Sequence, residues 1–203
     1  MRILPAGDAG VLVELADLGE VGRLYAALRR DPPPGTLDLV PATRTVLVTL
    51  DRARTDPDAV AAAVRALTVP AADTAGAADL IEIHTRYDGP DLAEVATLTG
   101  LTEDEVVRRH GTTEWTVAFC GFAPGFAYLT GGDPALSVPR RTTPRTAVPA
   151  GSVGLADSFS GAYPRRMPGG WQLIGRTDAV LWDSDRDPPA LLPPRTRVRF
   201  VPA

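Results

Sequence analysis

The sequence predicts an α+β N-terminal domain, residues 1–78 with its linker, followed by a mostly-β domain over residues 79–203. The N-terminal part alternates strand-like runs with two capped amphipathic helices. A stretch with few large apolar residues and no periodicity follows at 68–79 and is the expected linker. After His110, short apolar runs are broken by glycine and proline roughly every eight to twelve residues, which is typical of a β-barrel or sandwich.

The N-terminal domain is expected to follow the order β-β-α-β-β-α. A strand over residues 10–15 precedes a helix that begins near Asp17, where Glu20 completes a capping box. The run "DPPPG" must end this helix, because proline blocks its continuation. The strands "TLDLV" and "RTVLVTL" come next, and Asp56 then caps a second helix that has proline in its first position.

The second domain is expected to open with the strand "LIEIHTRY" and two short helices within residues 91–110. Gly100 separates the helices, and Thr102 with Glu105 caps the second one. This pattern is similar to a DNA-binding helix-turn-helix, but the second helix opens with three acidic residues that phosphates would repel. Further strands are predicted in "EWTVAF", "LSVP", "TAVPAGSVGLA", "WQLIG", "AVLW" and "TRVRFV".

Composition excludes several classes of function. The net charge is −4 with no basic stripe, which disfavours a nucleic-acid partner. All 21 basic residues are arginine, so this chain has no lysine for a Schiff base, a pyridoxal phosphate or a P-loop. No apolar run is long enough for a membrane helix, and a single cysteine forms no internal disulfide. We therefore expect a cytoplasmic protein with no membrane partner.

Cys120 is the obvious candidate nucleophile, but a catalytic thiol needs a base or a positive field. Only His84 and His110 could supply an imidazole, and at a strand end a free cysteine is more often a small buried residue. The histidine spacing fits no metal-ligand pattern, so no metal site is expected. His110 stands at a helix end, where it could be a cation near the helix dipole or a proton shuttle, and it remains a catalytic candidate.

Three glycine-rich segments, "GFAPGFAYL", "VPAGSVG" and "MPGGWQLIGRT", together indicate a small-molecule pocket, although hairpin turns would explain any one of them. Gln172 is the only carboxamide side chain, and it both donates and accepts, which matches a lactam or a urea unless it simply faces water. The expected aromatic walls are Phe122, Phe126, Tyr128, Tyr163 and Trp171. The polar groups expected to orient a carboxylate, an amide or a phosphate are Gln172, Ser152, Arg145 and Arg176.

At these motifs the chain resembles the family known as allophanate hydrolase subunit 1, the B subunit of 5-oxoprolinase, or the kinase inhibitor KipI. The resemblance is carried by "YDGPDL", "GFAPGFAYL", "PRRTTPRTAVPAGSVG", "PGGWQLIGRT" and "DPPALLPPRTRVRFVP", in that order. It runs over nearly the whole chain. The departures are modest: Met167 replaces a common serine, and His84 replaces a usual proline.

The resemblance implies that the second domain is a cyclophilin-like β-barrel. It also implies a subunit of an enzyme that opens a small lactam substrate, 5-oxoproline, to glutamate with ATP, and with Mg²⁺ accompanying the nucleotide. The implied partners are allophanate hydrolase subunit 2, also called the C subunit of 5-oxoprolinase, and a third component. The alternatives are a histidine-kinase inhibitor that acts by binding, or a subunit of an allophanate or urea-derivative hydrolase.

The predicted site combines the residue reasoning with the family pattern. Charge stabilisation is assigned to two arginines and the backbone amides of residues 151–154, with Gln172 holding the substrate. The candidate catalytic residues are Arg145, Gln172, Arg176 and His110. The candidate substrate-binding residues are Phe122, Phe126, Tyr128, Gly151, Ser152, Gly154, Gly170 and Trp171.

Overall fold

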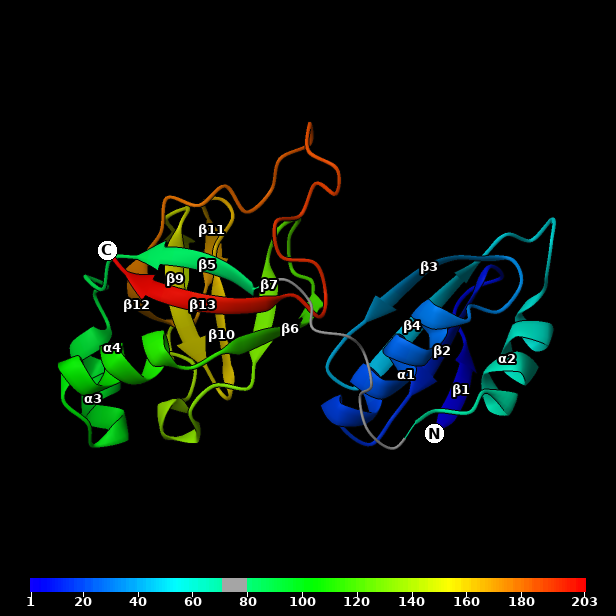
Figure 1. The fold of residues 1–203 in the computed structure, drawn as a ribbon, viewed down its shortest axis with the longest axis horizontal. Helices are drawn as coiled ribbons and strands as arrows, with labels where there is room; N and C mark the ends of the chain where they lie inside the picture. The colour runs from blue at the N-terminus through cyan, green and yellow to red at the C-terminus, as the bar shows by residue number, and fades with distance from the viewer. Residues whose placement is uncertain (71–79) are drawn as a thin grey trace. The chain divides into compact units, whose positions relative to one another are not determined.

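A computed structural model describes residues 1–70 and 80–203 and divides the chain into two compact units, Met1–Ala77 and Ala78–Ala203 (Figure 1). Most of the predicted linker, and the predicted boundary between residues 78 and 79, lie outside the described residues. Among the described residues, no helix has the length and apolar character needed to cross a membrane.

The first unit is an antiparallel four-stranded sheet with two helices, in the element order expected from the sequence. The strand order is β1-β2-β4-β3. The helices pack on one face of the sheet, and their apolar residues form one core with the valines of β2 and β4. The bounds are β1 (Arg2–Pro5), β2 (Gly10–Glu14), α1 (Leu18–Arg30), β3 (Thr36–Pro41), β4 (Thr45–Leu50) and α2 (Pro57–Ala66).

The start of α1 is fixed locally. Asp17 accepts a hydrogen bond from the backbone N–H of Glu20, as expected for an N-cap. The Glu20 carboxylate accepts from the N–H of Ala16, one residue before the position that a capping box uses. The helix ends at Arg30, directly before the proline run.

The second unit is mostly β, and its seven-stranded sheet has the order β12-β9-β10-β7-β6-β13-β5. The two outer strands are joined by a bridge in which Arg86 and Arg176 exchange backbone hydrogen bonds of 2.8 and 2.9 Å, so the sheet is nearly closed into a barrel (Figure 1). The bounds are β5 (Leu80–Thr85), β6 (Trp115–Cys120), β7 (Ala127–Thr130), β9 (Ser152–Ala156), β10 (Phe159–Ala162), β12 (Gln172–Arg176) and β13 (Arg197–Pro202).

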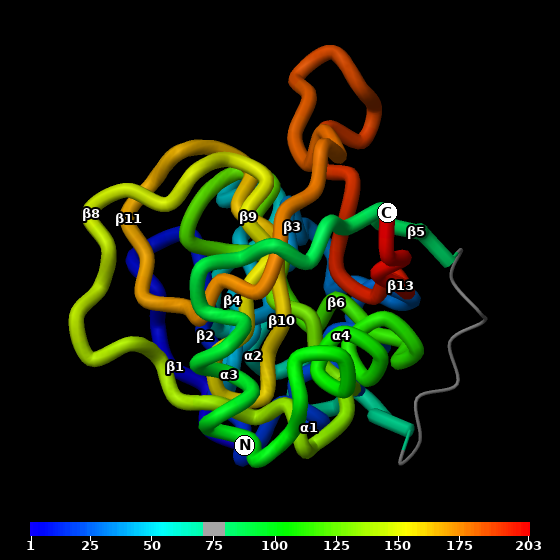
Figure 2. Tube along the Cα trace, turned by 90° about the vertical axis from the view of Figure 1, so that its left-hand side faces the viewer, coloured from blue at the N-terminus to red at the C-terminus, as the bar shows by residue number. Residues whose placement is uncertain are grey.

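Two predicted strands are wrong. The run "LSVP" begins with the last residue of a 3-10 turn, η1 (Pro134–Leu136), whose start is capped by Asp133 accepting the N–H of Ala135. Within this run, Val138 makes one isolated bridge. "AVLW" contributes one bridge, from Trp182, and the segment between β12 and β13 instead projects from the barrel (Figure 2). Strands β7, β10 and β11 (Met167–Gly169) were not among the predicted runs, and β11 pairs with β8 (Arg145–Val148) in a separate ribbon.

Helices α3 (Leu92–Thr99) and α4 (Glu103–Thr112) cover part of the barrel. Gly100 ends α3 in the left-handed conformation, with φ of 70°, and Thr102 and Glu105 form the predicted capping box. Helix α3 packs against β12, and α4 packs against β13. This packing brings the N-terminal end of α3 next to the start of β12.

Candidate functional site

A groove of about 520 Å³ lies beside the start of β12. Three segments line it: residues 90–98 around the start of α3, residues 139–142 before β8, and Gln172, the first residue of β12. These segments are up to 82 positions apart in sequence, as in the contact between Asp91 and Leu173. The packing of α3 on β12 is therefore what assembles the groove.

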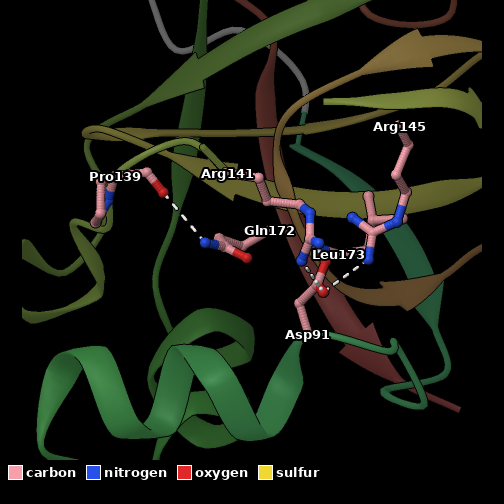
Figure 3. A network of polar contacts seen from close by, with 6 residues as sticks. All are labelled: Asp91, Pro139, Arg141, Arg145, Gln172 and Leu173. Carbon is pink, nitrogen blue, oxygen red and sulfur yellow. Dashed lines mark hydrogen bonds and ion pairs between the residues drawn. The ribbon is translucent and has the colours of Figure 1, made fainter. Parts of the chain in front are cut away.

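Asp91 is the centre of the polar network in this groove (Figure 3). Its side chain is only 5% exposed, and its Oδ1 accepts hydrogen bonds from Arg141 Nη1 at 2.9 Å and Arg145 Nη2 at 2.7 Å. The other oxygen, Oδ2, accepts the backbone N–H of Leu173 at 2.7 Å. One buried carboxylate thus meets two guanidinium groups, which leaves this cluster with a net positive charge.

Gln172 is buried, and its amide has a defined orientation. Nε2 donates to the backbone carbonyl of Pro139 at 3.3 Å (Figure 3). Because a carbonyl only accepts, the NH₂ group must face Pro139, and the oxygen Oε1 faces the other way. Oε1 is buried and has no hydrogen-bond partner, so the site offers an unused acceptor.

The two arginines also have unused donors. Arg141 Nε and Arg145 Nη1 are buried without a hydrogen-bond partner. Arg140 is an exposed neighbour that lines the groove and lies near Gly170, whose carbonyl accepts the backbone N–H of Arg141 at 2.7 Å. The groove therefore combines guanidinium donors with one amide acceptor, which suits an anion that also carries an N–H or O–H group.

The predicted aromatic residues come together, but mainly as a packed core. The Phe126 ring is 1% exposed and lies between 5.1 and 5.3 Å from the rings of Tyr128, Tyr163 and Trp171. Phe122 is 59% exposed, with φ of 70°, and its ring contacts the ring of Phe126. Burial raises the pKa of Tyr128 and of Tyr163. These rings support the strands around the groove, since the groove itself is lined by other residues.

Arg176 lies at the opposite end of β12 from Gln172, roughly 13 Å away at the usual rise of a strand. It pairs with Asp88 at 2.7 Å, and both side chains are exposed. Ser152 is paired with Arg176 across the ladder, and Gly151 packs against Thr177. The structure therefore separates the four predicted polar residues into two places, Arg145 with Gln172 and Arg176 with Ser152.

The backbone amides of residues 151–154 do not form the expected anion-binding turn. The N–H of Gly151 donates to Tyr163, and the N–H of Ser152 donates to Pro149. Gly154 lies inside β9, paired with Gly161 on one side and Leu173 on the other. The sheet and its turn use this backbone, because β9 has a neighbouring strand on each side.

His110 is buried in the barrel core, with neither ring nitrogen free. Nδ1 lies 2.7 Å from the Tyr87 hydroxyl, and Nε2 lies 2.7 Å from Ser160 Oγ, which in turn donates to the carbonyl of Gly154. Burial lowers the pKa of His110 to about 3, so the ring is neutral at pH 7. The expectation of a cation at the helix end is wrong, because the buried ring bonds two neutral hydroxyl groups. A catalytic role for His110 stays a prediction.

Cys120 ends β6 and donates its thiol to the carbonyl of Leu192 at 3.3 Å. Burial raises the pKa of this thiol to about 11, which keeps it protonated at neutral pH. The expectation that it packs at a strand end is confirmed. Among residues 1–70 and 80–203, no group of three or more His, Cys, Asp or Glu side chains could hold a metal ion.

Sequence reasoning missed two central residues, Asp91 and Arg141. Both lie within motifs that carried the resemblance, "YDGPDL" and "PRRTTPRT". The available signal was charge: two aspartates in one motif and three arginines in six positions of the other carry opposite charges, which pair when the fold brings them together. Arg145 was selected as a site residue, whereas its ion-pair partner Asp91 and the nearby Arg141 were not.

Comparisons with known proteins agree on one family. A family model described as carboxyltransferase domain, subdomain C and D, matches residues 1–192. The B subunit of the 5-oxoprolinase of Escherichia coli O157:H7 is 52% identical over 125 residues, which are 60% of this chain and 57% of that protein. The chain therefore spans just over half the length of this curated relative.

Solved structures show the same fold. The crystal structure of TTHA0988 matches with a TM-score of 0.80 at 35% identity, covering 97% of this chain and 40% of that one. The urea amidolyase of K. lactis matches with a TM-score of 0.74 over 99% of this chain and 15% of that one. At 19% identity, the second likeness concerns the fold alone.

Proposed function

Because the chain belongs to the family described as carboxyltransferase domain, subdomain C and D, we propose that it is a subunit of an ATP-dependent complex that opens 5-oxoproline to glutamate. A relative named as the B subunit of 5-oxoprolinase, 52% identical over 125 residues, supports this proposal. The proposed partners are the C subunit of that enzyme and a third component. The proposed fold is an α+β unit followed by a cyclophilin-like barrel.

The single observation that carries the proposal is the free acceptor of Gln172. Pro139 fixes the amide so that Oε1 is the unpaired atom. A buried acceptor without a donor costs free energy, and a ligand N–H would recover it. A lactam offers such an N–H, and a carboxylate at the same position would be repelled. The unpaired acceptor therefore matches the lactam N–H of 5-oxoproline at this point of the groove.

The arginines supply the second half of the recognition. 5-Oxoproline carries one carboxylate beside its lactam ring, and the pair Arg141 and Arg145 remains net positive after Asp91 is counted. Their unpaired atoms are Arg141 Nε and Arg145 Nη1. A guanidinium N–H to a carboxylate is a strong, charge-assisted hydrogen bond. A small monoanion with an amide N–H therefore fits the donors and the acceptor of the groove together.

ATP, when bound, would supply the phosphoryl group that makes the amide oxygen a better leaving group. This chain has no lysine, so arginines would hold the phosphates, and Arg140 is the arginine of the groove that is not assigned to the carboxylate. Arg140 is exposed and suits a shared site closed by a partner protein. The residues of this chain hold the lactam and its carboxylate, and keep the acceptor of Gln172 away from bulk water.

The test uses the complex reconstituted from this chain, the C subunit and the third component. Oxoproline-dependent ATP hydrolysis is measured for the wild type and for Gln172→Met, which keeps the length of the side chain and removes its acceptor. We expect the KM for oxoproline to rise roughly tenfold or more, because the lactam N–H loses its partner. Arg199→Gln serves as the control. Arg199 is an exposed arginine on strand β13, outside the groove, and it lies near Glu82.

Three results would oppose the proposal. A wild-type complex with no oxoproline-dependent ATP turnover would refute the function itself. A Gln172→Met complex with the wild-type KM and kcat would move the substrate away from this groove. Full turnover by this chain alone would refute the shared active site.

A further inference from the structure

Asp91 begins helix α3, yet its side chain makes no hydrogen bond to the free N–H groups of that helix. The residues at the same position of the other α-helices, Asp17, Asp56 and Thr102, each accept such a bond. Capping is the usual role of an aspartate at a helix start. The carboxylate of Asp91 is therefore held for another purpose, and the contacts around it indicate which.

The contacts of Asp91 join the two sides of the groove. Its carboxylate binds Arg141 and Arg145, which stand before and at the start of β8. Its other oxygen accepts the N–H of Leu173, and its own N–H donates to the carbonyl of Leu173 at 2.9 Å. Leu173 follows Gln172 directly. One buried side chain thus fixes both guanidinium groups and the backbone next to the amide acceptor.

The hydrogen bonds of Asp91 leave other polar atoms of the neighbouring side chains without a partner. Oδ1 occupies one nitrogen of each guanidinium, Arg141 Nη1 and Arg145 Nη2. Arg141 Nε and Arg145 Nη1 stay unpaired, as does Gln172 Oε1. Without a carboxylate between them, two guanidinium groups would repel each other and move apart. Asp91 therefore sets the separation and direction of the donors.

We propose that Asp91 is a positioning residue, which holds Arg141, Arg145 and the start of β12 so that the two arginines and Gln172 bind one small carboxylate-bearing amide. This inference rests on the proposed function for the identity of the substrate. Asp91 itself needs no contact with the reacting atoms. Its removal acts on substrate binding through the arginines.

The first test compares Asp91→Asn with Asp88→Asn in the reconstituted complex. The amide introduced by Asp91→Asn retains an oxygen for the Leu173 N–H and loses the charge that holds the arginines. We expect Asp91→Asn to raise the KM for oxoproline roughly tenfold or more while kcat changes less. Asp88 is the matched control, because it is an exposed aspartate three positions earlier that pairs with Arg176 outside the groove. An unchanged KM in Asp91→Asn would overturn the inference.

The second test asks whether Asp91 acts through Arg145. Arg145→Gln breaks the same contact from the other side, and it also serves if Asp91→Asn does not fold. We expect the KM of the double variant to rise by less than the product of the two single effects, because Asp91 acts in part through Arg145. A double variant whose KM rises by the product of the two single effects would show that Asp91 acts independently of Arg145, and this would overturn the inference.

A third readout does not depend on turnover. Side-chain NMR of the Nε–Hε groups of the arginines, without substrate, compares wild type and Asp91→Asn. We expect the signals of Arg141 and Arg145 to shift or broaden, while that of Arg176 stays in place. Unchanged signals of both groove arginines would refute the positioning role alone. Absence of oxoproline-dependent ATP turnover in the wild-type complex would refute the proposed function alone.

Discussion

Buried polar side chains in the second unit are of two kinds. His110 bonds Tyr87 and Ser160 through its two ring nitrogens, so every polar atom of its ring is satisfied. Gln172 keeps one unpaired acceptor, and Arg145 one unpaired donor. A satisfied buried group stabilises a unique core, whereas an unpaired one costs free energy unless a ligand or water completes it. The first kind stabilises the core. Of the second kind, Gln172 lines the groove and Arg145 contacts Asp91 beside it, whereas the unpaired Nε of Arg109 lies elsewhere.

His110 makes stability depend on pH. The folded protein keeps this ring neutral down to about pH 3, whereas an unfolded chain protonates it near pH 6.5. The unfolded state therefore binds an extra proton below pH 6.5, and the free energy of unfolding falls by about 1.4 kcal/mol per pH unit as the pH drops below that value. At higher pH the contribution is constant. Urea unfolding between about pH 7 and pH 5 measures this slope.

The control for that measurement is the second histidine. His110→Gln should lower stability at neutral pH and flatten the slope, and His84→Gln, at an exposed position, should keep it. Carboxylates whose pKa is lowered, such as Glu105 and Asp133, act only below their ordinary values of 4.5 and 3.8. A wild-type stability that is equal at about pH 7 and pH 5 would contradict the account of His110.

At the scale of elements, strand β12 has a different role at each end. Its first residue, Gln172, lies in the groove, and its last residue, Arg176, closes the barrel through the bridge to Arg86. Residues 86–91 run along this strand, with hydrogen bonds from Gly89 to Ile174 and between Asp91 and Leu173. Residues 86–91 therefore pair with β12 much as a strand would, from the bridge at Arg86 to the start of α3 at Asp91. The site depends on how closely this segment approaches β12.

Gly89 permits that approach. A Cβ at this position would overlap the carbonyl oxygen of Leu173 and the carbonyl carbon of Ile174, which are backbone atoms that cannot swing away. We expect Gly89→Ala to destabilise the protein by about 1 to 3 kcal/mol and to raise the KM for oxoproline by displacing Asp91. Thermal or urea unfolding together with kinetics of the complex measures both effects.

Gly22 is the matched control for Gly89, because it lies inside α1, where a Cβ would meet no atom within 4 Å apart from the local helix backbone. Gly22→Ala should stabilise the protein by about 0.5 to 1 kcal/mol, since alanine is the better helix former. If Gly89→Ala were as harmless as Gly22→Ala, the close contact between residues 86–91 and β12 would be wrong.

The same elements explain what the sequence could predict. The N-cap of α1, the capping box of α4 and the break at Gly100 were predicted because each depends on residues close together in sequence. The glycine-rich motifs pointed to Gln172 and Arg145. Sequence reasoning did not find Asp91, because its pairing with Arg145 spans 54 positions and depends on packing α3 against β12. It also grouped Arg176 with Gln172, because the two residues are only four positions apart in sequence. In an extended strand, four positions are enough to place them at opposite ends.

At the scale of the whole molecule, each unit has its own apolar core. The core of the first unit draws its apolar side chains from residues between 3 and 67, and the two clusters of the second draw theirs from residues between 81 and 200. Among the described residues, no core cluster mixes side chains from both units. Each unit therefore buries the apolar surface that an independently folding domain needs.

This division predicts that residues 79–203 fold without the first unit. A fragment of these residues should give a cooperative thermal transition and a near-ultraviolet circular dichroism signal from its buried Trp115 and Trp171. The full chain is the reference for both signals. A fragment that lacks a cooperative transition would mean that the first unit is required for the barrel to fold.

The chain also matches only part of the proteins it is similar to. The match covers 57% of the Escherichia coli relative and 40% of the TTHA0988 chain. The proposed function accordingly assigns substrate recognition to this chain and completion of the active site to partners. Inhibition of a histidine kinase, the alternative implied by the resemblance, stays a prediction. Neighbouring genes for the partner proteins would support the enzyme subunit, and a neighbouring gene for a sensor kinase would support the inhibitor.

The central claim is that Gln172 Oε1 accepts the N–H of a lactam, and N-methylation of 5-oxoproline tests it most directly. The measurement is kcat/KM of the reconstituted complex for 5-oxoproline and for its N-methyl derivative, with wild type and with Gln172→Met. The account predicts that wild type prefers 5-oxoproline roughly tenfold or more, and that Gln172→Met loses most of this preference. Equal kcat/KM values for the two compounds in the wild type, or a preference that survives in Gln172→Met, would contradict it.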